Sequence, residues 1–559
     1  MRLTRPELQS LSFQLQGLEK LKRKIMGQSV MRVRVSIFTI LAFSSFLLLF
    51  TLFYIPFLRI LSLGLSFQGL LAVLRDSYYR RVISFTFGQA VLSTVLTLIV
   101  SFPGAYVLSH YDFPGKRTLK AIITVPFVMP SVMVALGFII LFGKQGPFSW
   151  LNILYSWKAI VLAHIFYNYP VVVRIVSSAW ERINPHYEEA ALSLGAKGFT
   201  LFRKVTLPLL FPSILLSSLM TFIFCFMSFS IPLILGGYKY ATIEVAIFSS
   251  AMMLLDFKTS SSLALLQLVF NFLLMYLYIK IASAYSREEE QKVNVRRKKL
   301  TLSPGGILIL SYFILIFLLI LGPLFAVFLD SFMFNGKFSF EWYRRAFSQE
   351  YNPMFGTSSL FALLNTLRFG FLAVGISLLL SLPLAYLSIR KKLRGKSIID
   401  VLVTLPLASS PVILGLGYLI TFRSSPIYGH WILIALAHAT VAYPFVFRTV
   451  SLAIQKVKKN LSEAALTLGA NEAYSFMRIE LPLIKGGVLV ASVFAFAISV
   501  AELATTYMLA KPEYTTLTLA IYKFISSRQF GPASALSVIL MAISMLSFLL
   551  IERIGEEVW

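Results

Sequence analysis

The sequence predicts an all-α integral membrane protein, with about twelve transmembrane helices arranged as two parallel repeats of six. The first observation behind this is composition: of 559 residues, 57% are hydrophobic and 13% are charged, more apolar surface than a soluble protein of this length can bury. The second is that apolar residues form blocks of about 20, the length that a helix needs to cross a bilayer. The third is an internal repeat.

Each half of the chain contains six candidate spans. Helices are required because an unpaired backbone group in lipid is costly. The most polar candidate, 157–179, contains His164, Asn168 and Arg174. The spans are predicted at 36–58, 83–109, 119–142, 157–179, 208–235 and 262–282, and at 306–329, 359–388, 398–421, 431–454, 483–507 and 532–552.

The placement of charge predicts the topology. With the N-terminus in the cytoplasm, the cytoplasmic segments hold most of the 51 lysines and arginines, as the positive-inside rule requires. Dense basic clusters occur at 20–24, 296–299 and 390–394. We therefore expect both termini in the cytoplasm and attribute the net charge of +27 to contacts with anionic lipids, not with nucleic acid.

The same patterns divide the chain into four regions. A basic cytoplasmic tail is predicted at 1–35, and a first membrane half at 36–285. A polar cytoplasmic linker at 286–305 then leads to a second membrane half at 306–559.

The repeat is clearest in one short segment. Residues 189–196 read EAALSLGA, and residues 463–470 read EAALTLGA. The same separation pairs His164 with His438, each near the outer end of a span. A structural hydrogen bond is one reading of these histidines, and a role in the transport pathway is the other.

Both copies of the segment predict a helix, a glycine turn and a second helix in water. In the first, Asn184 can cap the helix and Pro185 suits its first position. In the second, Asn460 and Glu463 have the spacing of a capping box. Gly195 and Gly469 can end the two helices in the left-handed conformation. Phe202 and Phe476 occupy matching positions on the second arm, and as exposed apolar side chains they would need a partner surface.

These segments resemble the EAA loop of ATP-binding-cassette importer permeases. The pattern is Glu-Ala-Ala, a glycine four positions further on, and Leu-Pro at the start of the next span, and it occurs twice. The fused arrangement resembles the ferric-iron and thiamine permeases, whose two halves share one polypeptide. The matching residues are Glu189, Ala190, Ala191, Gly195, Leu207 and Pro208, and Glu463, Ala464, Ala465, Gly469, Leu481 and Pro482.

The resemblance implies a type I importer permease in the inner membrane. Two copies of a separate ATPase would bind the loops from the cytoplasm, and a binding protein would deliver solute outside, at the external loops 236–261 and 508–531. Ferric iron and thiamine are the solutes that it suggests, and polyamine or sulfate stays open. The alternative is that the loops only connect spans. The residues implied in coupling are Glu189, Ala190, Gly195, Phe202, Glu463, Ala464, Gly469 and Phe476.

The chain is not expected to be an enzyme or to hold a cofactor. Gly395-Lys396-Ser397 matches the end of a phosphate-binding loop, but Arg390 stands where the first glycine is needed, so ATP must bind a partner. The five histidines have no metal-ligand spacing, and no acidic pair accompanies them.

A polar residue within a span is a candidate for the pathway. Glu502 in the eleventh span is the outstanding one, and its repeat partner is Ser228. Glu502 either lines the pathway or makes a buried hydrogen bond, and both readings stay open.

The main alternative to an importer subunit is a secondary transporter of the major-facilitator kind, which also has two parallel six-helix halves. Such a transporter would need ion-coupling charges in its spans and has no need of two matched loops. A membrane enzyme or channel is the third reading. The sequence offers no catalytic cluster or selectivity filter for it.

Overall fold

The computed structural model describes residues 37–285, 298–299, 304–391 and 396–558. The predicted basic tail and most of the predicted linker lie outside the described residues. Ten described helices are long and apolar enough to cross a membrane, or up to twelve if each of two bent pairs counts as one span. This agrees with the all-α membrane fold that the sequence predicts.

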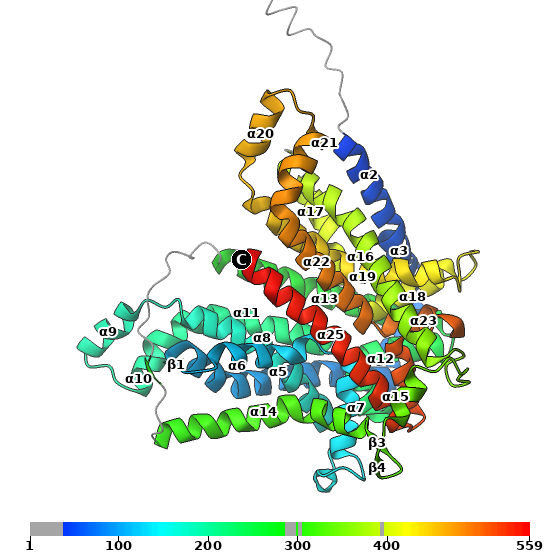
Figure 1. Cartoon of the computed structure of the whole chain (residues 1–559), viewed down its shortest axis with the longest axis horizontal. Helices are drawn as coiled ribbons and strands as arrows, with labels where there is room; N and C mark the ends of the chain where they lie inside the picture. The colour runs from blue at the N-terminus through cyan, green and yellow to red at the C-terminus, as the bar shows by residue number, and fades with distance from the viewer. Residues whose placement is uncertain (1–36, 286–297, 300–303, 392–395, 559) are drawn as a thin grey trace, which may run out of the picture.

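The two halves follow the same order of long helices (Figure 1). The first half contains α2 (Ile37–Leu49), η1 (Phe50–Tyr54), α3 (Ile55–Gly64), α4 (Phe67–Arg75), α5 (Ser77–His110), β1 (Tyr111–Asp112), α6 (Lys116–Val128), α7 (Ser131–Phe142), α8 (Trp157–Trp180), α9 (Pro185–Ser193), α10 (Phe199–Leu201), η3 (Phe202–Thr206), α11 (Leu207–Phe226), η4 (Pro232–Gly236), α12 (Ile243–Met252) and α13 (Phe257–Tyr285).

The second half is preceded by β2 (Lys298–Lys299), which pairs with β1 in parallel. It contains α14 (Pro304–Asp330), β3 (Met333–Phe334), β4 (Lys337–Phe338), α15 (Glu341–Ala346), α16 (Ser359–Arg390), α17 (Lys396–Thr404), α18 (Pro411–Phe422), α19 (Trp431–Lys456), α20 (Lys459–Thr467), α21 (Glu472–Ser475), η8 (Phe476–Glu480), α22 (Leu481–Ala501), α23 (Ala504–Leu509), α24 (Leu517–Ser526) and α25 (Phe530–Val558).

Two of the predicted spans are not straight helices. Residues 119–142 are divided between α6 and α7, which meet at 100°, and 398–421 are divided between two helices that meet at 102°. Pro130 and Pro411 stand at the breaks, and the residue before each of them has an extended backbone. Proline disfavours a helical conformation in the residue before it, so the apolar run continues while the helix does not.

The spans predicted at 208–235 and 483–507 also end early. α11 ends at Phe226 and α22 at Ala501, and the chain then leaves the long helix. The segments predicted as external loops contain the short helices α12 and α24, most of whose residues are buried. Repeat-related threonines hold both helices in place, because Thr86 Oγ1 accepts from Ile243 N at 2.9 Å and Thr366 Oγ1 from Leu517 N at 2.8 Å.

The first long helix of each half packs against the other half. α2 lies along α16, and α14 lies along α7. Glycines at equivalent positions allow two close contacts between the halves. A Cβ on Gly137 of α7 would lie 2.3 Å from the carbonyl oxygen of Pro323 on α14, and one on Gly417 of α18 would lie 3.0 Å from Cβ of Pro56 on α3. The halves are therefore interlocked.

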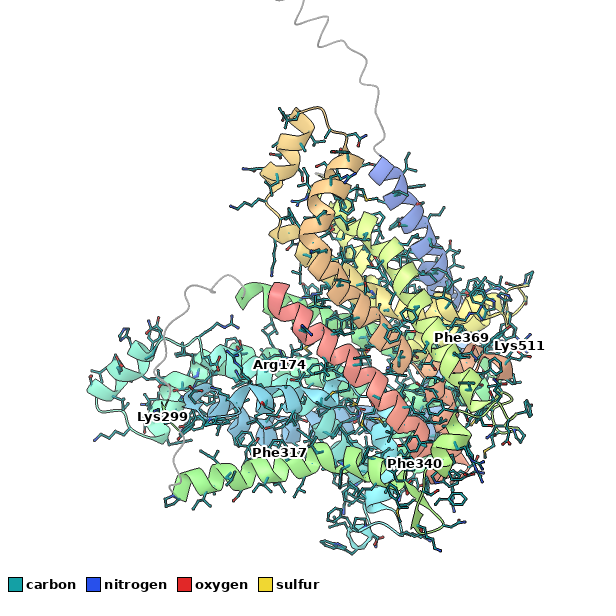
Figure 2. The ribbon with its side chains drawn as sticks, in the orientation of Figure 1. Arg174, Lys299, Phe317, Phe340, Phe369 and Lys511 are labelled. Atoms are coloured by element: carbon teal, nitrogen blue, oxygen red, sulfur yellow. The ribbon has the colours of Figure 1, made fainter. Side chains whose placement is uncertain are left out.

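Figure 1 shows two arms that diverge toward α9 and α20 and converge near α7, α12, α18 and α23. Each arm has its own packed side chains (Figure 2). Phe369 on α16 is fully buried, and its ring centroid lies 6.0 Å from that of His438. Phe317 on α14 packs against the apolar cluster formed with α5, α6 and α8.

Candidate functional site

The two EAA-like segments form helix–turn–helix elements at the ends of the two arms (Figure 1). α9 begins as predicted, with Pro185 in its first position and Asn184 Oδ1 accepting a hydrogen bond from His186 N at 3.0 Å. Both first helices end at a glycine in the left-handed region, Gly195 at φ +88° and Gly469 at φ +91°. Glycine takes this conformation without a steric penalty, so the predicted turns are confirmed.

The capping pair predicted for the second loop is wrong. α20 begins at Lys459, so Asn460 lies inside the helix and cannot cap it. The extended residue before the helix is Lys458, which provides no side-chain cap. Glu463 pairs with Lys459 instead, at 3.3 Å on the exposed face.

The sequence predicts that Phe202 and Phe476 are exposed, and this prediction is wrong. Phe476 is 5% exposed and packs edge-on against Tyr386, with ring centroids 5.3 Å apart. Phe202 is half-buried, with its ring 5.9 Å from that of Phe102 and 6.5 Å from that of Trp180. Neither ring is exposed, because both pack against aromatic side chains of the long helices. This packing attaches the second arm of each loop to the membrane helices.

The exposed apolar residues of the loops lie elsewhere. Leu194 is 89% exposed and Leu468 is 88% exposed, and they occupy the same repeat position directly before the turn glycine. Leu192 and Leu466 are another exposed repeat pair. Surface side chains this apolar, at the tips of two separate arms, indicate contact with a partner. Exposed beside them are Glu189, Ala190, Glu463 and Ala464.

A carboxylate–hydroxyl hydrogen bond closes each loop, with the two residue types exchanged between the halves. In the first half, Thr206 Oγ1 donates to Glu188 Oε1 at 2.7 Å. In the second half, Ser462 Oγ donates to Glu480 Oε1 at 2.5 Å. Glu188 and Ser462 are repeat partners, as are Thr206 and Glu480. Sequence reasoning missed the bond because neither position keeps its residue type.

The second loop is also held by ion pairs. Arg390 at the end of α16 donates through Nε to Glu480 at 3.0 Å, and through Nη2 to the carbonyl oxygens of Ile454 and Val457, both at 3.1 Å. Its neighbour Lys391 pairs with Glu472 of α21. The first loop rests mainly on the aromatic packing around Trp180. The two loops thus share a shape and differ in how they are fastened.

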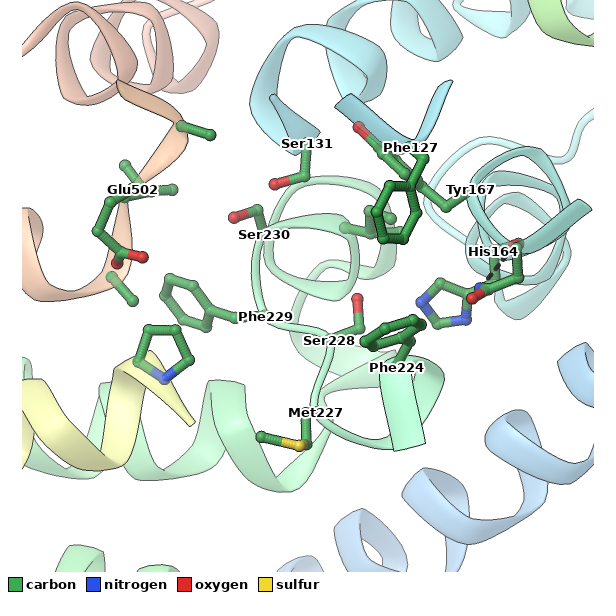
Figure 3. Close-up of a pocket in the computed structure, with 16 residues that line it drawn as sticks. Phe127, Ser131, His164, Tyr167, Phe224, Met227, Ser228, Phe229, Ser230 and Glu502 are labelled. Atoms are coloured by element: carbon green, nitrogen blue, oxygen red, sulfur yellow. Dashed lines mark hydrogen bonds between the residues drawn. The ribbon is translucent and has the colours of Figure 1, made fainter. Parts of the chain in front are cut away.

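A cavity of about 300 Å³ lies where the arms meet, and both halves contribute to it (Figure 3). Glu502 and Ser228, the two predicted pathway residues, both line it. Each stands just after a long helix ends, α22 for Glu502 and α11 for Ser228. The aromatic side chains in its wall are those of Phe127, Tyr167, Phe224 and Phe229.

The two histidines of the repeat differ in their partners. His438 bonds through both ring nitrogens, to Ser499 Oγ and Thr506 Oγ1, each at 2.8 Å. His164 lines the cavity and bonds through Nδ1 to Ser93 Oγ at 3.1 Å. Its Nε2 is buried, with no hydrogen-bond partner among the described residues. His438 therefore makes the structural hydrogen bonds that one reading expects, whereas His164 lines the cavity with one ring nitrogen unbonded in the described chain.

Sequence reasoning missed one buried carboxylate, Glu244 of α12. It is fully buried and accepts hydrogen bonds from Gln267 Nε2 and, at 3.0 Å, from Ser410 Oγ of the other half. Ser410 precedes Pro411, which lines the cavity. The residue was missed because its segment was read as an external loop. Among the described residues, no group of three His, Cys, Asp or Glu side chains could hold a metal ion.

Known proteins resemble this chain over most of its length. The chain matches the family described as binding-protein-dependent transport system inner membrane component twice, at residues 101–286 and 377–558. The thiamine transport system permease protein of Escherichia coli is 26% identical over 506 residues, which cover 86% of this chain and 90% of that protein. The ferric transport system permease protein of Actinobacillus pleuropneumoniae is 25% identical over 507 residues, covering 87% and 73%.

A solved bacterial ABC transporter involved in the import of alginate aligns with 49% of this chain and all of that chain, at a TM-score of 0.34 and 14% identity. The family match lies in both halves and includes both EAA-like segments. Together with ten or more apolar helices, it makes this chain a multi-pass membrane protein. The chain belongs to the family of inner membrane components of binding-protein-dependent transport systems, as a permease with two fused halves.

Proposed function

We propose that this permease imports thiamine or ferric iron, delivered by a binding protein at the outer face. The names of the two relatives suggest these solutes. Two copies of a separate ATPase would drive the import from the cytoplasm, each bound to one of the loops formed by α9 and α20. ATP would bind only to those partner subunits.

The observation that carries this proposal is the pair Leu194 and Leu468. Two nearly fully exposed leucines at equivalent positions, one on each arm, are suited to two identical partner surfaces. A displacement of either loop would be transmitted to the long helices. The contacts that would transmit it are the packing of Phe202 and Phe476 and the carboxylate–hydroxyl bonds. Gly195 and Gly469 would keep the exposed helices at the angle that docking requires.

The orientation follows from charge. Both loops, and the basic ends of α5 and α16, would face the cytoplasm, together with both termini. The regions 1–35, 36–285, 286–305 and 306–559 would then be a cytoplasmic tail, a first permease half, a linker and a second permease half. Closure of the ATPase dimer would draw α9 and α20 together and open the cavity outward, and hydrolysis would restore the arrangement described here.

The test is ATPase binding and ATP-driven uptake by the full chain in proteoliposomes, with its ATPase and its binding protein. Leu194→Asp and Leu468→Asp each place a charge on an exposed apolar tip, so each is expected to weaken ATPase binding about tenfold, and the double variant to abolish uptake. Phe338→Asp, on an exposed residue of β4 at the other end of the molecule, is the matched control.

Two results would contradict the proposal. One is ATPase binding that the double leucine variant leaves unchanged. The other is solute uptake by the chain alone under an ion gradient, as a major-facilitator-like transporter would show.

A further inference from the structure

The cavity between the halves has a polar group at each end and aromatic rings between them. Glu502 of the second half lies at one end and His164 of the first half at the other, with Phe229 between them (Figure 3). Its volume of about 300 Å³ is at the lower end of the range for small-molecule sites.

The end formed by His164 is incomplete without a ligand. In the second half, Thr506 bonds to Nε2 of His438 at 2.8 Å. The equivalent position in the first half is Pro232, which has no side-chain hydroxyl. His164 Nε2 is therefore a buried polar atom without a partner in the described chain, a costly arrangement that a ligand atom would relieve.

The other end of the cavity is formed by Glu502, the one acidic side chain among its lining residues in the described part of the chain. Its Oε1 accepts a hydrogen bond from Thr505 N at 2.9 Å. None of the cavity-lining residues in the described part of the chain is a lysine or arginine. A second carboxyl group, that of Glu244, accepts a hydrogen bond from Ser410, the residue directly before Pro411 in the cavity wall. The site is thus suited to a positively charged solute.

The walls favour an organic cation over a metal ion. The rings of Phe127 and Phe224 have centroids 6.1 Å apart and planes tilted by 56°, and Tyr167 and Phe229 complete the aromatic lining. Aromatic faces attract organic cations and stack on flat rings. A bare metal ion would instead need several carboxylate or imidazole ligands together, and among the described residues no group of three His, Cys, Asp or Glu side chains could hold one.

We infer that this cavity is a transit site for a flat, aromatic, singly charged organic cation that also carries a hydrogen-bonding ring nitrogen or amino group. The Glu502 carboxyl group binds the positively charged part of the solute. The phenyl rings of the cavity stack on the solute's flat rings, and His164 Nε2 forms a hydrogen bond with its polar group. The inference rests on the proposed function, and between the two proposed solutes it selects the thiamine type.

The test is equilibrium dialysis of radiolabelled thiamine with the full chain in lipid nanodiscs, without the ATPase. We expect saturable binding that Glu502→Gln and His164→Phe each weaken at least tenfold. Glu513→Gln, at an exposed carboxylate outside the cavity, should leave binding unchanged. An excess of ferric citrate should not compete.

Retained binding of the ATPase by both cavity variants checks that they fold. Absence of saturable thiamine binding, or thiamine binding that both cavity variants leave unchanged, would overturn the inference. Failure of the proposed function has a separate signature, since uptake would then not depend on ATP even where the nanodisc experiment detects thiamine.

Discussion

Arg390 and Glu480 form a buried ion pair at the base of the second EAA-like loop. The arginine Nε lies 3.0 Å from Glu480 Oε2, and the two side chains are 9% and 0% exposed. The other oxygen of Glu480 accepts from Ser462 on α20. One carboxylate therefore joins the end of α16 to α20, the helix that ends directly before Leu468.

Removing one partner of this pair should uncouple transport. Arg390→Met leaves a buried carboxylate without its counter-ion, a change that costs about 3–5 kcal/mol in comparable sites. We expect ATP hydrolysis to continue while solute uptake falls at least tenfold, measured as solute imported per ATP hydrolysed in proteoliposomes.

The control for this variant is Lys459→Gln. It breaks the exposed pair with Glu463 on the same loop, whose side chains are 51% and 57% exposed. Exposed pairs contribute about 0–1 kcal/mol, so coupling should be unchanged. Equal effects of the two variants would show that the buried pair has no special role.

The two close glycine contacts should tolerate a methyl group very differently. An added Cβ on Gly137 meets the Pro323 carbonyl at 2.3 Å, and backbone cannot easily move away. On Gly417 the nearest atom is Pro56 Cβ at 3.0 Å. Gly137→Ala should therefore lose about 1–3 kcal/mol of stability and Gly417→Ala clearly less. The thermal unfolding midpoints in detergent measure this, and a lower midpoint for Gly417→Ala would contradict it.

The sequence predicts the parts of the site that are determined by residues close together in the chain. Gly195 and Gly469 end their helices through a local conformational preference, and Asn184 caps α9 through a bond two residues along. Because the segment occurs twice, chance does not account for these local signals. For the same reason the two-half architecture is visible without a structure.

The missed features depend on distant neighbours. Phe476 is buried because Tyr386 lies beside it, and no local pattern reports that contact. Glu244 is buried because its short helix enters the protein from a segment that has the length of a loop. A hydropathy pattern does not show the bends at Pro130 and Pro411, because the residues on both sides of each bend are apolar and read as one continuous span.

Substitution of the turn glycines should disturb ATPase binding without unfolding the chain. An added Cβ at Gly195 or Gly469 meets nothing within 4 Å, so only the positive φ opposes a side chain. Gly195→Asp and Gly469→Asp add a charge beside the exposed leucines, and we expect ATPase binding to weaken about tenfold. Gly469→Asn is the matched comparison, because asparagine tolerates this backbone and carries no charge.

Normal membrane insertion of all three variants, followed by pull-down of the ATPase, provides the measurement. Full ATPase binding and transport by both aspartate variants would remove the loops from the coupling mechanism. Equal loss in the asparagine variant would assign the effect to the backbone and not to charge.

The repeat-related histidines should respond in opposite ways to the same substitution. His438→Phe leaves the hydroxyls of Ser499 and Thr506 without their ring partners, and the loss of bonds to buried groups costs about 1–3 kcal/mol. His164→Phe breaks one bond to Ser93 but also removes an unpartnered nitrogen, so its thermal midpoint should stay close to that of the unaltered protein. Solute uptake should show the reverse order, with the larger loss in His164→Phe, because only that ring lines the cavity. Thermal midpoints and uptake rates measured on the same preparations test both halves of this prediction, and parallel changes in the two variants would mean that the histidines share one structural role.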